Sequence, residues 1–325
     1  MKSRNNLIDA AKGLGILLVV LGHVIQANLP DPDDNIVFRL IYSFHMPLFM
    51  FLSGMVAKYG SWSNVSKNII RLVLPFVCWY IIGYFIKSAQ HGDFLNVQEH
   101  FVKLVRNPDW GLWFLWVLFL CHCFFYIMYA CQQRLGLAGL ILVFLFIQVI
   151  PISIFGFSLL KLYFPYFVCG FLAMTHRNKV VRYRGIYIFI SFCIFIVLVP
   201  FWQRDSGQLI MQELSFLPNW LIRYDQYIIR LYKYFIGLAG IVTALGLCYY
   251  GIKLKSLRMF LVTIGLYTLE IYVSHQLFCN LGFGDSLIMI IISSFAVALG
   301  LSLLISFLLK KIPIIRTCLY GVTAK

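Results

Sequence analysis

Ten apolar runs follow one another along the chain, and most are long enough to cross a lipid bilayer. A window of about 19 residues places them at 7–27, 36–57, 69–87, 112–131, 137–152, 158–174, 185–202, 229–250, 259–279 and 286–309. With 61% hydrophobic and 12% charged residues, a soluble domain of 325 residues could not bury this much apolar surface. We expect an all-α, polytopic membrane helix bundle of about ten transmembrane helices, forming one membrane-embedded domain over residues 1–325 with no appended soluble domain.

The loops between these runs separate the charges into two groups. One set of alternate loops carries 17 basic residues and no acid, whereas the other set carries nine bases and ten acids. Cytoplasmic loops are enriched in Lys and Arg, so this pattern predicts that both termini are cytoplasmic. The same pattern explains the net charge of +15, so a nucleic-acid partner is not needed to explain it. We expect the lipid bilayer to be the partner of the chain.

The stretch "DAAKGLGILLVVLGH" puts an acid, a base and a histidine in or beside the first apolar run. Lys12 and His23 are separated by about 1100° of helix, which is three turns plus roughly 20°, and by about 16 Å along the axis. They therefore share a helix face, and Asp9 precedes Lys12 by one turn and can pair with it. These residues fit an interfacial ion pair with a hydrated histidine, or a functional site, because charge in hydrocarbon is costly.

Two other apolar runs carry polar side chains near their centres. "IYSFHMPLFMFLSG" contains His45, with Ser53 on the same helix face, and "TLEIYVSHQLF" contains Glu270, Tyr272 and His275. Glu270 is the only acid deep inside the predicted bundle, and at that depth it must be paired or protonated. These runs predict that histidines and an acid point into the bundle, toward Lys12 and His23.

Two features lie at the ends of spans. Lys67 and Arg71, four residues apart, suit phosphate binding as well as they suit a cytoplasmic anchor. Trp110, Trp113 and Trp116 recur every three residues at the other surface. An interfacial aromatic belt is the simpler interpretation of these indoles, and a platform for a sugar ring is the alternative.

The histidines do not have the spacing of metal ligands, and the sequence contains no Gly-rich phosphate loop. Histidines in this setting favour proton or acyl transfer, and we expect no metal. A proton-coupled transporter or flippase is the main alternative, because buried Glu, His and Lys can form a proton relay. Pro47, within the second apolar run, would suit the broken span of such a protein. The sequence shows no inverted repeat to support it.

Four stretches together resemble integral-membrane acyltransferase family 3, and most closely its fucose 4-O-acetylase-like branch. They are "IDAAKGLGILLVVLGH", "IYSFHMPLFMFLSG", "GLWFLWVLF" and "TLEIYVSHQLF". His23 matches the essential histidine of this family, and Lys12 matches its essential base, which is often arginine. Many members of the family have an Arg-x-x-Arg motif. The corresponding stretch here is "KNIIR", with Asn68 at the first arginine position.

The resemblance implies acetyl transfer from cytosolic acetyl-CoA to a hydroxyl of a surface polysaccharide or lipid-linked glycan precursor, in a bacterial inner membrane. His23 would act as general base or acyl carrier. The sequence leaves open the acceptor sugar, the acyl group and whether the chain forms a homo-oligomer. The resulting site prediction is catalytic His23, Lys12, Asp9, Glu270 and His45; donor-binding Lys67, Arg71 and Lys12; and acceptor-binding Ser53, Tyr272, His275, Trp113 and Trp116.

Overall fold

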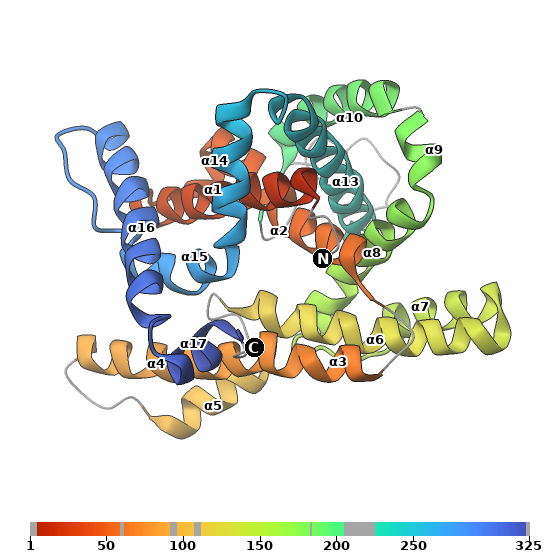
Figure 1. Cartoon of the computed structure of the whole chain (residues 1–325), viewed down its shortest axis with the longest axis horizontal. Helices are drawn as coiled ribbons and strands as arrows, with labels where there is room; N and C mark the ends of the chain where they lie inside the picture. The colour runs from red at the N-terminus through yellow and green to blue at the C-terminus, as the bar shows by residue number, and fades with distance from the viewer. Residues whose placement is uncertain are drawn as a thin grey trace. The chain divides into compact units, whose positions relative to one another are not determined.

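The computed structural model describes residues 5–58, 62–91, 96–106, 112–182, 184–204 and 225–322. Within these ranges the regular secondary structure is helical, which confirms the predicted all-α class (Figure 1). Eight helices of the described residues are long and apolar enough to cross a membrane. They are Asn6–Asn28, Ile36–Val56, Trp62–Ile86, Trp113–Leu135, Phe157–Thr175, Arg184–Phe201, Ile228–Gly251 and Leu287–Leu309. The chain is therefore a multi-pass membrane protein.

Two of the ten expected spans differ from simple transmembrane helices. The run predicted at 137–152 forms α7 (Leu137–Val149), whose 13 residues rise roughly 20 Å, less than the ~30 Å hydrocarbon core. The run predicted at 259–279 is broken into α14 (Lys255–Leu266) and a second segment, Thr268–Phe278, with a 60° bend between them. A third helix begins at Trp62 rather than at residue 69, because the polar turn "WSNVSKN" lowers the hydropathy without preventing helix formation.

Local hydrogen bonds explain the break between α14 and α15 (Thr268–Ser274). The Thr268 hydroxyl donates to the Gly265 carbonyl oxygen (2.8 Å), and the Tyr267 amide donates to Ile264, three residues back instead of four. A Thr side chain that bonds a nearby carbonyl competes with the helical ladder at that point. Tyr267 consequently lies at the break, as the residue that caps the amino-terminal end of α15.

The chain divides into two compact units, and α2, α8 and α16 each contribute residues to both. The first unit comprises Met1–Leu52 and Leu172–Leu304. It contains α1 (Asn6–Asn28), η1 (Pro32–Asp34), most of α2 (Ile36–Val56), α9 (Arg177–Arg182), α10 (Arg184–Leu198), η3 (Val199–Phe201), α13 (Asp225–Gly251), α14, α15, η4 (His275–Phe278) and most of α16 (Leu287–Leu309). Helix α1 packs on α13, α14 and α15 (Figure 1).

Glycines let α1 and α14 approach each other closely. A Cβ atom on Gly13 would lie 2.0 Å from the Leu261 carbonyl oxygen, and one on Gly265 would lie 1.9 Å from the Asp9 carbonyl oxygen. These glycines thus form two halves of one backbone-to-backbone crossing, as small residues do between membrane helices. The crossing fixes the amino-terminal half of α1 against the helix that leads into α15.

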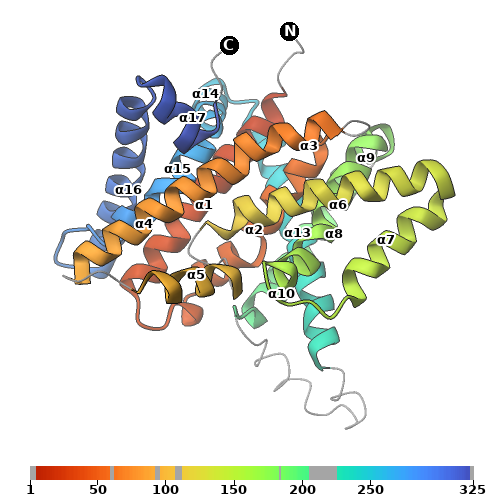
Figure 2. The ribbon, with the colours of Figure 1, turned by 90° about the horizontal axis from the view of Figure 1, so that it is seen from below.

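The second unit comprises Ser53–Phe171 and Ile305–Lys325. It contains α3 (Trp62–Asn68), the π-helical turn η2 (Ile69–Val73), α4 (Leu74–His91), α5 (Val97–Arg106), α6 (Trp113–Leu135), α7, most of α8 (Phe157–Thr175) and α17 (Pro313–Tyr320). Helices α6 and α7 form an antiparallel pair (Figure 2). Helix α17 packs on α4, where the Trp79 indole donates to the Leu319 carbonyl oxygen (3.0 Å). The single-domain organisation and the cytoplasmic termini remain predictions.

Candidate active site

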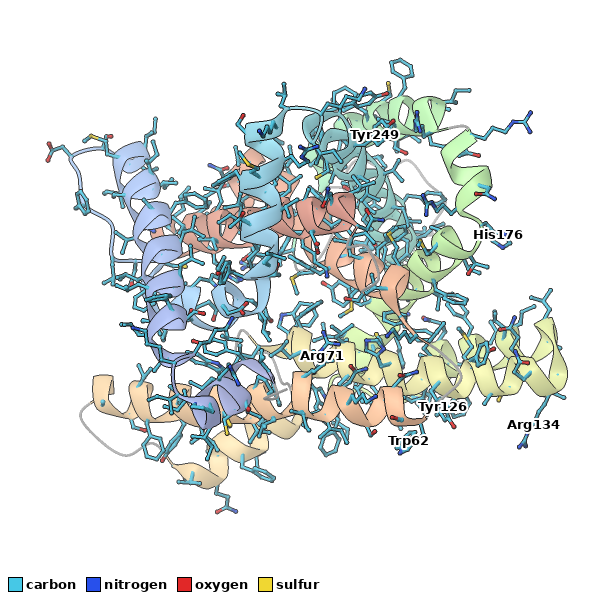
Figure 3. The ribbon with its side chains drawn as sticks, viewed as in Figure 1. Trp62, Arg71, Tyr126, Arg134, His176 and Tyr249 are labelled. Atoms are coloured by element: carbon cyan, nitrogen blue, oxygen red, sulfur yellow. The ribbon has the colours of Figure 1, made fainter. Side chains whose placement is uncertain are left out.

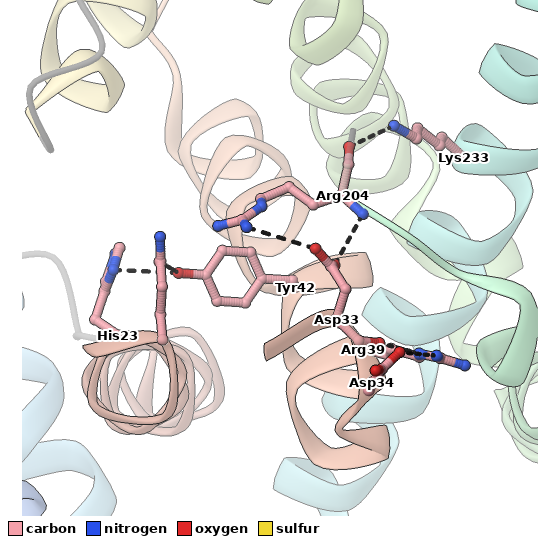
Figure 4. A network of polar contacts seen from close by, with 8 residues as sticks. His23, Asp33, Asp34, Arg39, Tyr42, Arg204 and Lys233 are labelled. Atoms are coloured by element: carbon pink, nitrogen blue, oxygen red, sulfur yellow. Dashed lines mark hydrogen bonds and ion pairs between the residues drawn. The ribbon is translucent and has the colours of Figure 1, made fainter. Parts of the chain in front are cut away.

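His23 lies on the carboxyl-terminal half of α1 in the first unit, where its side chain is half-buried. Its Nδ1 atom is 3.1 Å from the hydroxyl of Tyr42, on α2. The same hydroxyl donates to Oε1 of Gln26, one turn after His23 on α1 (2.5 Å). The three residues therefore form a hydrogen-bonded chain between two helices. Figure 4 shows the contact between His23 and Tyr42.

His45 and His275 lie beside this chain and are both buried. Nδ1 of His45 is 2.8 Å from the Ile41 carbonyl oxygen, and its ring is 4.7 Å from that of Tyr42. The ring of His275, in η4, is 5.2 Å from that of His23. Three histidines that the sequence places in three separate runs thus gather in one unit.

Backbone carbonyls fix the tautomers of the two buried imidazoles. Nδ1 of His275 is 2.9 Å from the Ile271 carbonyl and 2.8 Å from the Tyr272 carbonyl. A carbonyl only accepts, so Nδ1 of His45 and of His275 carries the proton, and in a neutral ring Nε2 holds the lone pair. Backbone carbonyls therefore set the tautomer of both of these rings.

His275 presents a nitrogen that is ready for proton transfer. The side chain is fully buried, and its Nε2 has no hydrogen-bond partner among the described residues. A buried polar atom without a partner is costly, and such atoms occur at sites that receive a ligand or a proton. The arrangement can accept a proton at more than one imidazole. Within the described ranges, no three His, Cys, Asp or Glu side chains are placed to hold a metal ion.

A second set of bonds holds the end of α1 against the segment that carries His275. The Asn28 side-chain amide donates both to the Val24 carbonyl (2.8 Å) and to the Cys279 carbonyl (3.0 Å). Because Asn28 is on α1 and Cys279 directly follows η4, this contact links the two elements that carry His23 and His275. It contributes to the spacing between the two rings.

A charged rim adjoins the Tyr42 side of the cluster (Figure 4). The Arg204 guanidinium pairs with Asp33 (3.5 Å), while the Arg204 backbone amide donates to the same carboxylate (3.2 Å). Lys233 donates to the Arg204 carbonyl oxygen (2.9 Å). Arg204 also lies over the Phe38 ring (5.6 Å), which stacks on Tyr42 (4.0 Å). This network joins the segment after α1 to the segment after α10.

Four other predicted residues of the first unit lie along α1 and α15. Asp9 is buried and Lys12 is half-buried in the half of α1 that packs on α14. Glu270 and Tyr272 are buried in α15, which also packs on α1. The prediction that their runs supply inward-facing polar groups agrees with these positions, and their chemical roles remain predictions.

The donor-binding candidates lie in the second unit. Lys67 is the last residue but one of α3, and Arg71 (Figure 3) lies in the π-helical turn that follows. Both side chains are exposed. The two residues remain four positions apart across the junction of α3 and this turn, and their pairing on a phosphate stays a prediction. Ser53, on the last turn of α2, also belongs to this unit.

The indoles are engaged in packing within the second unit. Trp113 stacks on Tyr163 (4.9 Å), whereas Trp116 stacks on Phe76 (5.8 Å) and donates to the Phe155 carbonyl oxygen (2.8 Å). These contacts favour the structural role over the sugar platform. Trp110 lies outside the described residues.

The sequence analysis missed Gln26, Asn28, Tyr42 and Arg204. A signal existed for two of them: Gln26 follows His23 by three residues and Tyr42 precedes His45 by three, so each shares a helix face with a predicted histidine. Asn28 and Arg204 follow apolar runs, and nothing in their local sequence indicates which segment they contact.

The family model described as "Acyltransferase domain" matches residues 5–311, a range that includes every residue of the histidine cluster. The chain belongs to acyltransferase family 3. Membership confirms the resemblance carried by the four sequence stretches.

Two curated relatives are Nodulation protein NolL of Sinorhizobium fredii and of Mesorhizobium japonicum. The first is 29% identical over 217 residues, 63% of this chain and 59% of its own length. The second is 26% identical over 218 residues, again 63% of this chain and 58% of its own length. The matched part thus spans less than two thirds of either relative. No solved structure matches this chain.

Proposed function

We propose that the chain is a membrane O-acyltransferase that moves an acetyl group from acetyl-CoA to a hydroxyl of a cell-surface polysaccharide or a lipid-linked glycan precursor. The cluster of His23, His45 and His275, inside a chain of this family, is the observation that carries the proposal. The bacterial relatives support a place in a bacterial inner membrane.

The reaction breaks the thioester C–S bond and forms an ester C–O bond, and the proton of the acceptor hydroxyl ends on the coenzyme A thiolate. His23 takes that proton as general base, or attacks the thioester and carries the acetyl group before passing it on. Both routes need an unprotonated ring nitrogen on His23. Trapping an acetylated enzyme in the absence of acceptor would distinguish them.

The remaining polar residues have supporting roles in the proposal. Lys12, steadied by Asp9, stabilises the negative charge that develops on the thioester oxygen. Exposed Lys67 and Arg71 supply the positive charge that the phosphates of coenzyme A require. We assign no separate metal to the reaction.

The test is release of free thiol from acetyl-CoA by purified protein with and without a glycan acceptor, together with mass spectrometry of the acceptor. Loss of a general base lowers the rate by about 10²–10⁴-fold, and we expect a loss of this size in His23→Ala. His176→Ala is the matched control, because His176 is an exposed histidine at the end of α8. Thiol release that is near normal in folded His23→Ala would refute the role of His23, and transport without thiol release would favour a transporter.

A further inference from the structure

The hydroxyl of Tyr42 links His23 to Gln26, and this link determines which nitrogen of His23 carries a proton. A tyrosine hydroxyl has one hydrogen to donate. In the structure that hydrogen is donated to Oε1 of Gln26 (2.5 Å), so the contact between the Tyr42 oxygen and Nδ1 of His23 (3.1 Å) needs its hydrogen from His23. The proton of a neutral His23 is therefore on Nδ1, and the lone pair is on Nε2.

Packing holds the Tyr42 ring in the position that this chain needs. The ring stacks on Phe38 with 4.0 Å between centroids and lies 4.7 Å from the ring of His45. On the α1 side it rests against Gly22, where a Cβ atom would come within 2.8 Å of the ring. Glycine at position 22 thus allows the Tyr42 hydroxyl to reach both His23 and Gln26.

The same tautomer recurs at the two neighbouring histidines. His45 and His275 donate from Nδ1 to backbone carbonyl oxygens, which cannot change between donor and acceptor. His23 differs, since its Nδ1 partner is a hydroxyl that is able to donate or accept. The tautomer of His23 therefore depends on what residue 26 offers to Tyr42.

We propose that Tyr42 and Gln26 are positioning residues that fix His23 with its proton on Nδ1, so that Nε2 is the nitrogen that acts in acyl transfer. In this proposal neither residue touches the acyl donor or the acceptor, and both act through His23. Their catalytic consequence rests on the proposed role of His23, whereas the tautomer itself is a property of the hydrogen bonds and can be measured without turnover.

Substitutions at position 26 test the proposal with little risk to folding, because Gln26 is exposed near the end of α1. Gln26→Glu offers only acceptors to Tyr42 and keeps the proton of His23 on Nδ1. Gln26→Lys offers only donors, so the Tyr42 hydroxyl turns its hydrogen toward Nδ1 and the proton of His23 moves to Nε2. Gln26→Met is the neutral control that neither donates nor accepts strongly.

The direct measurement is the ¹⁵N chemical shift of the His23 ring nitrogens in protein labelled at histidine and held in detergent. The chain has seven histidines, and the His23 signals are those absent from His23→Gln. We expect the Nδ1–H form in wild type and Gln26→Glu, and the Nε2–H form in Gln26→Lys. An Nε2–H form in wild type, or an Nδ1–H form in Gln26→Lys, would overturn the proposal.

Kinetics then connect the tautomer to the reaction. A neutral hydrogen bond contributes about 1 kcal/mol, so we expect kcat to fall roughly fivefold in Gln26→Lys and Tyr42→Phe. We expect KM to be unchanged, and kcat of Gln26→Glu to stay within about twofold of wild type. The charge that Gln26→Lys or Gln26→Glu introduces near His23, His45, His275 and Arg204 would shift the midpoint of the pH–rate profile. Loss of the correct His23 tautomer would instead lower the plateau of that profile.

The two hypotheses fail in different ways. Wild-type protein with the Nδ1–H form but without acyl transfer would refute the proposed function and leave the positioning role of Tyr42 and Gln26 in the tautomer intact. Active protein in which Gln26→Lys shows the Nε2–H form and an unchanged plateau would refute the catalytic part of this inference and leave the proposed function standing.

Discussion

Gly265→Ala should destabilise the protein at the crossing of α1 and α14. The new Cβ atom would lie 1.9 Å from the Asp9 carbonyl oxygen, whereas ordinary contacts of this kind begin near 3.4 Å. The two helices must separate by about 1.5 Å, because both clashing groups belong to backbone or sit directly on it. Overpacking of this kind costs about 1–3 kcal/mol.

Gly300→Ala is the matched control for this substitution. Gly300 is exposed on α16, and a Cβ atom there would meet nothing within 4 Å. Alanine gains helix propensity of up to about 1 kcal/mol in a helix interior, such as position 300, and less at position 265, the last residue but one of α14. A difference in stability that exceeds this gain is therefore the packing cost at Gly265.

A thiol-reactive fluorescent dye provides the assay, since unfolding exposes buried cysteines such as Cys248 and Cys279 in the same unit. We expect the Tm of Gly265→Ala to be roughly 2–6 °C below that of Gly300→Ala. Gly13→Ala, which clashes with the Leu261 carbonyl at the same crossing, should behave alike. The double variant should cost less than the sum of the single costs, because one separation relieves both clashes. Equal Tm values for Gly265→Ala and Gly300→Ala, or additive costs, would refute the reasoning.

Three further predictions follow from single contacts. Asp33→Asn keeps an oxygen that accepts from the Arg204 amide and loses only a partly exposed ion pair, so its free energy of unfolding should fall by less than about 1 kcal/mol. Asp33→Ala loses both contacts and should be less stable than Asp33→Asn in thermal unfolding. Trp79→Phe leaves the Leu319 carbonyl without its buried donor, which costs about 1–3 kcal/mol of stability. Limited proteolysis should then cleave α17 faster than in wild type, and an unchanged rate of cleavage would contradict this. Arg71→Ala should raise the KM for acetyl-CoA several-fold at constant kcat in the thiol-release assay, and a pure loss of kcat would count against a role in donor binding.

Hydropathy predicted the helical segments well because apolar content along a window depends on composition alone. Each of the ten runs forms helix. The shortest run, 137–152, gives the helix that is too short for a full span, α7. The start of the third span was placed too late, since Trp62 and its polar neighbours form a helix without being apolar. Helix formation depends on backbone hydrogen bonds, which hydropathy does not measure.

The histidines of the candidate site were predicted individually, because a polar residue in an apolar run is visible in the sequence. Their partners were harder to predict, since Tyr42 and Gln26 are ordinary residues for a membrane interface. Their importance arises from one hydroxyl that bridges α1 and α2. Such a bridge depends on the distance between helices, and Gly22 sets that distance without any chemical signal of its own.

The break at Tyr267 matters most for the site and is the feature that a hydropathy pattern is least able to predict. His275 follows Tyr267 by eight residues, or about 12 Å of helix rise. Bending the segment by 60° at Tyr267 moves His275 by about the same 12 Å from the position that a straight helix would give it. The observed distance of 5.2 Å between the rings of His23 and His275 therefore depends on the bend. Since the Thr268 hydroxyl bond to Gly265 accompanies the bend, a single side chain outside the histidine cluster helps to determine whether two imidazoles meet.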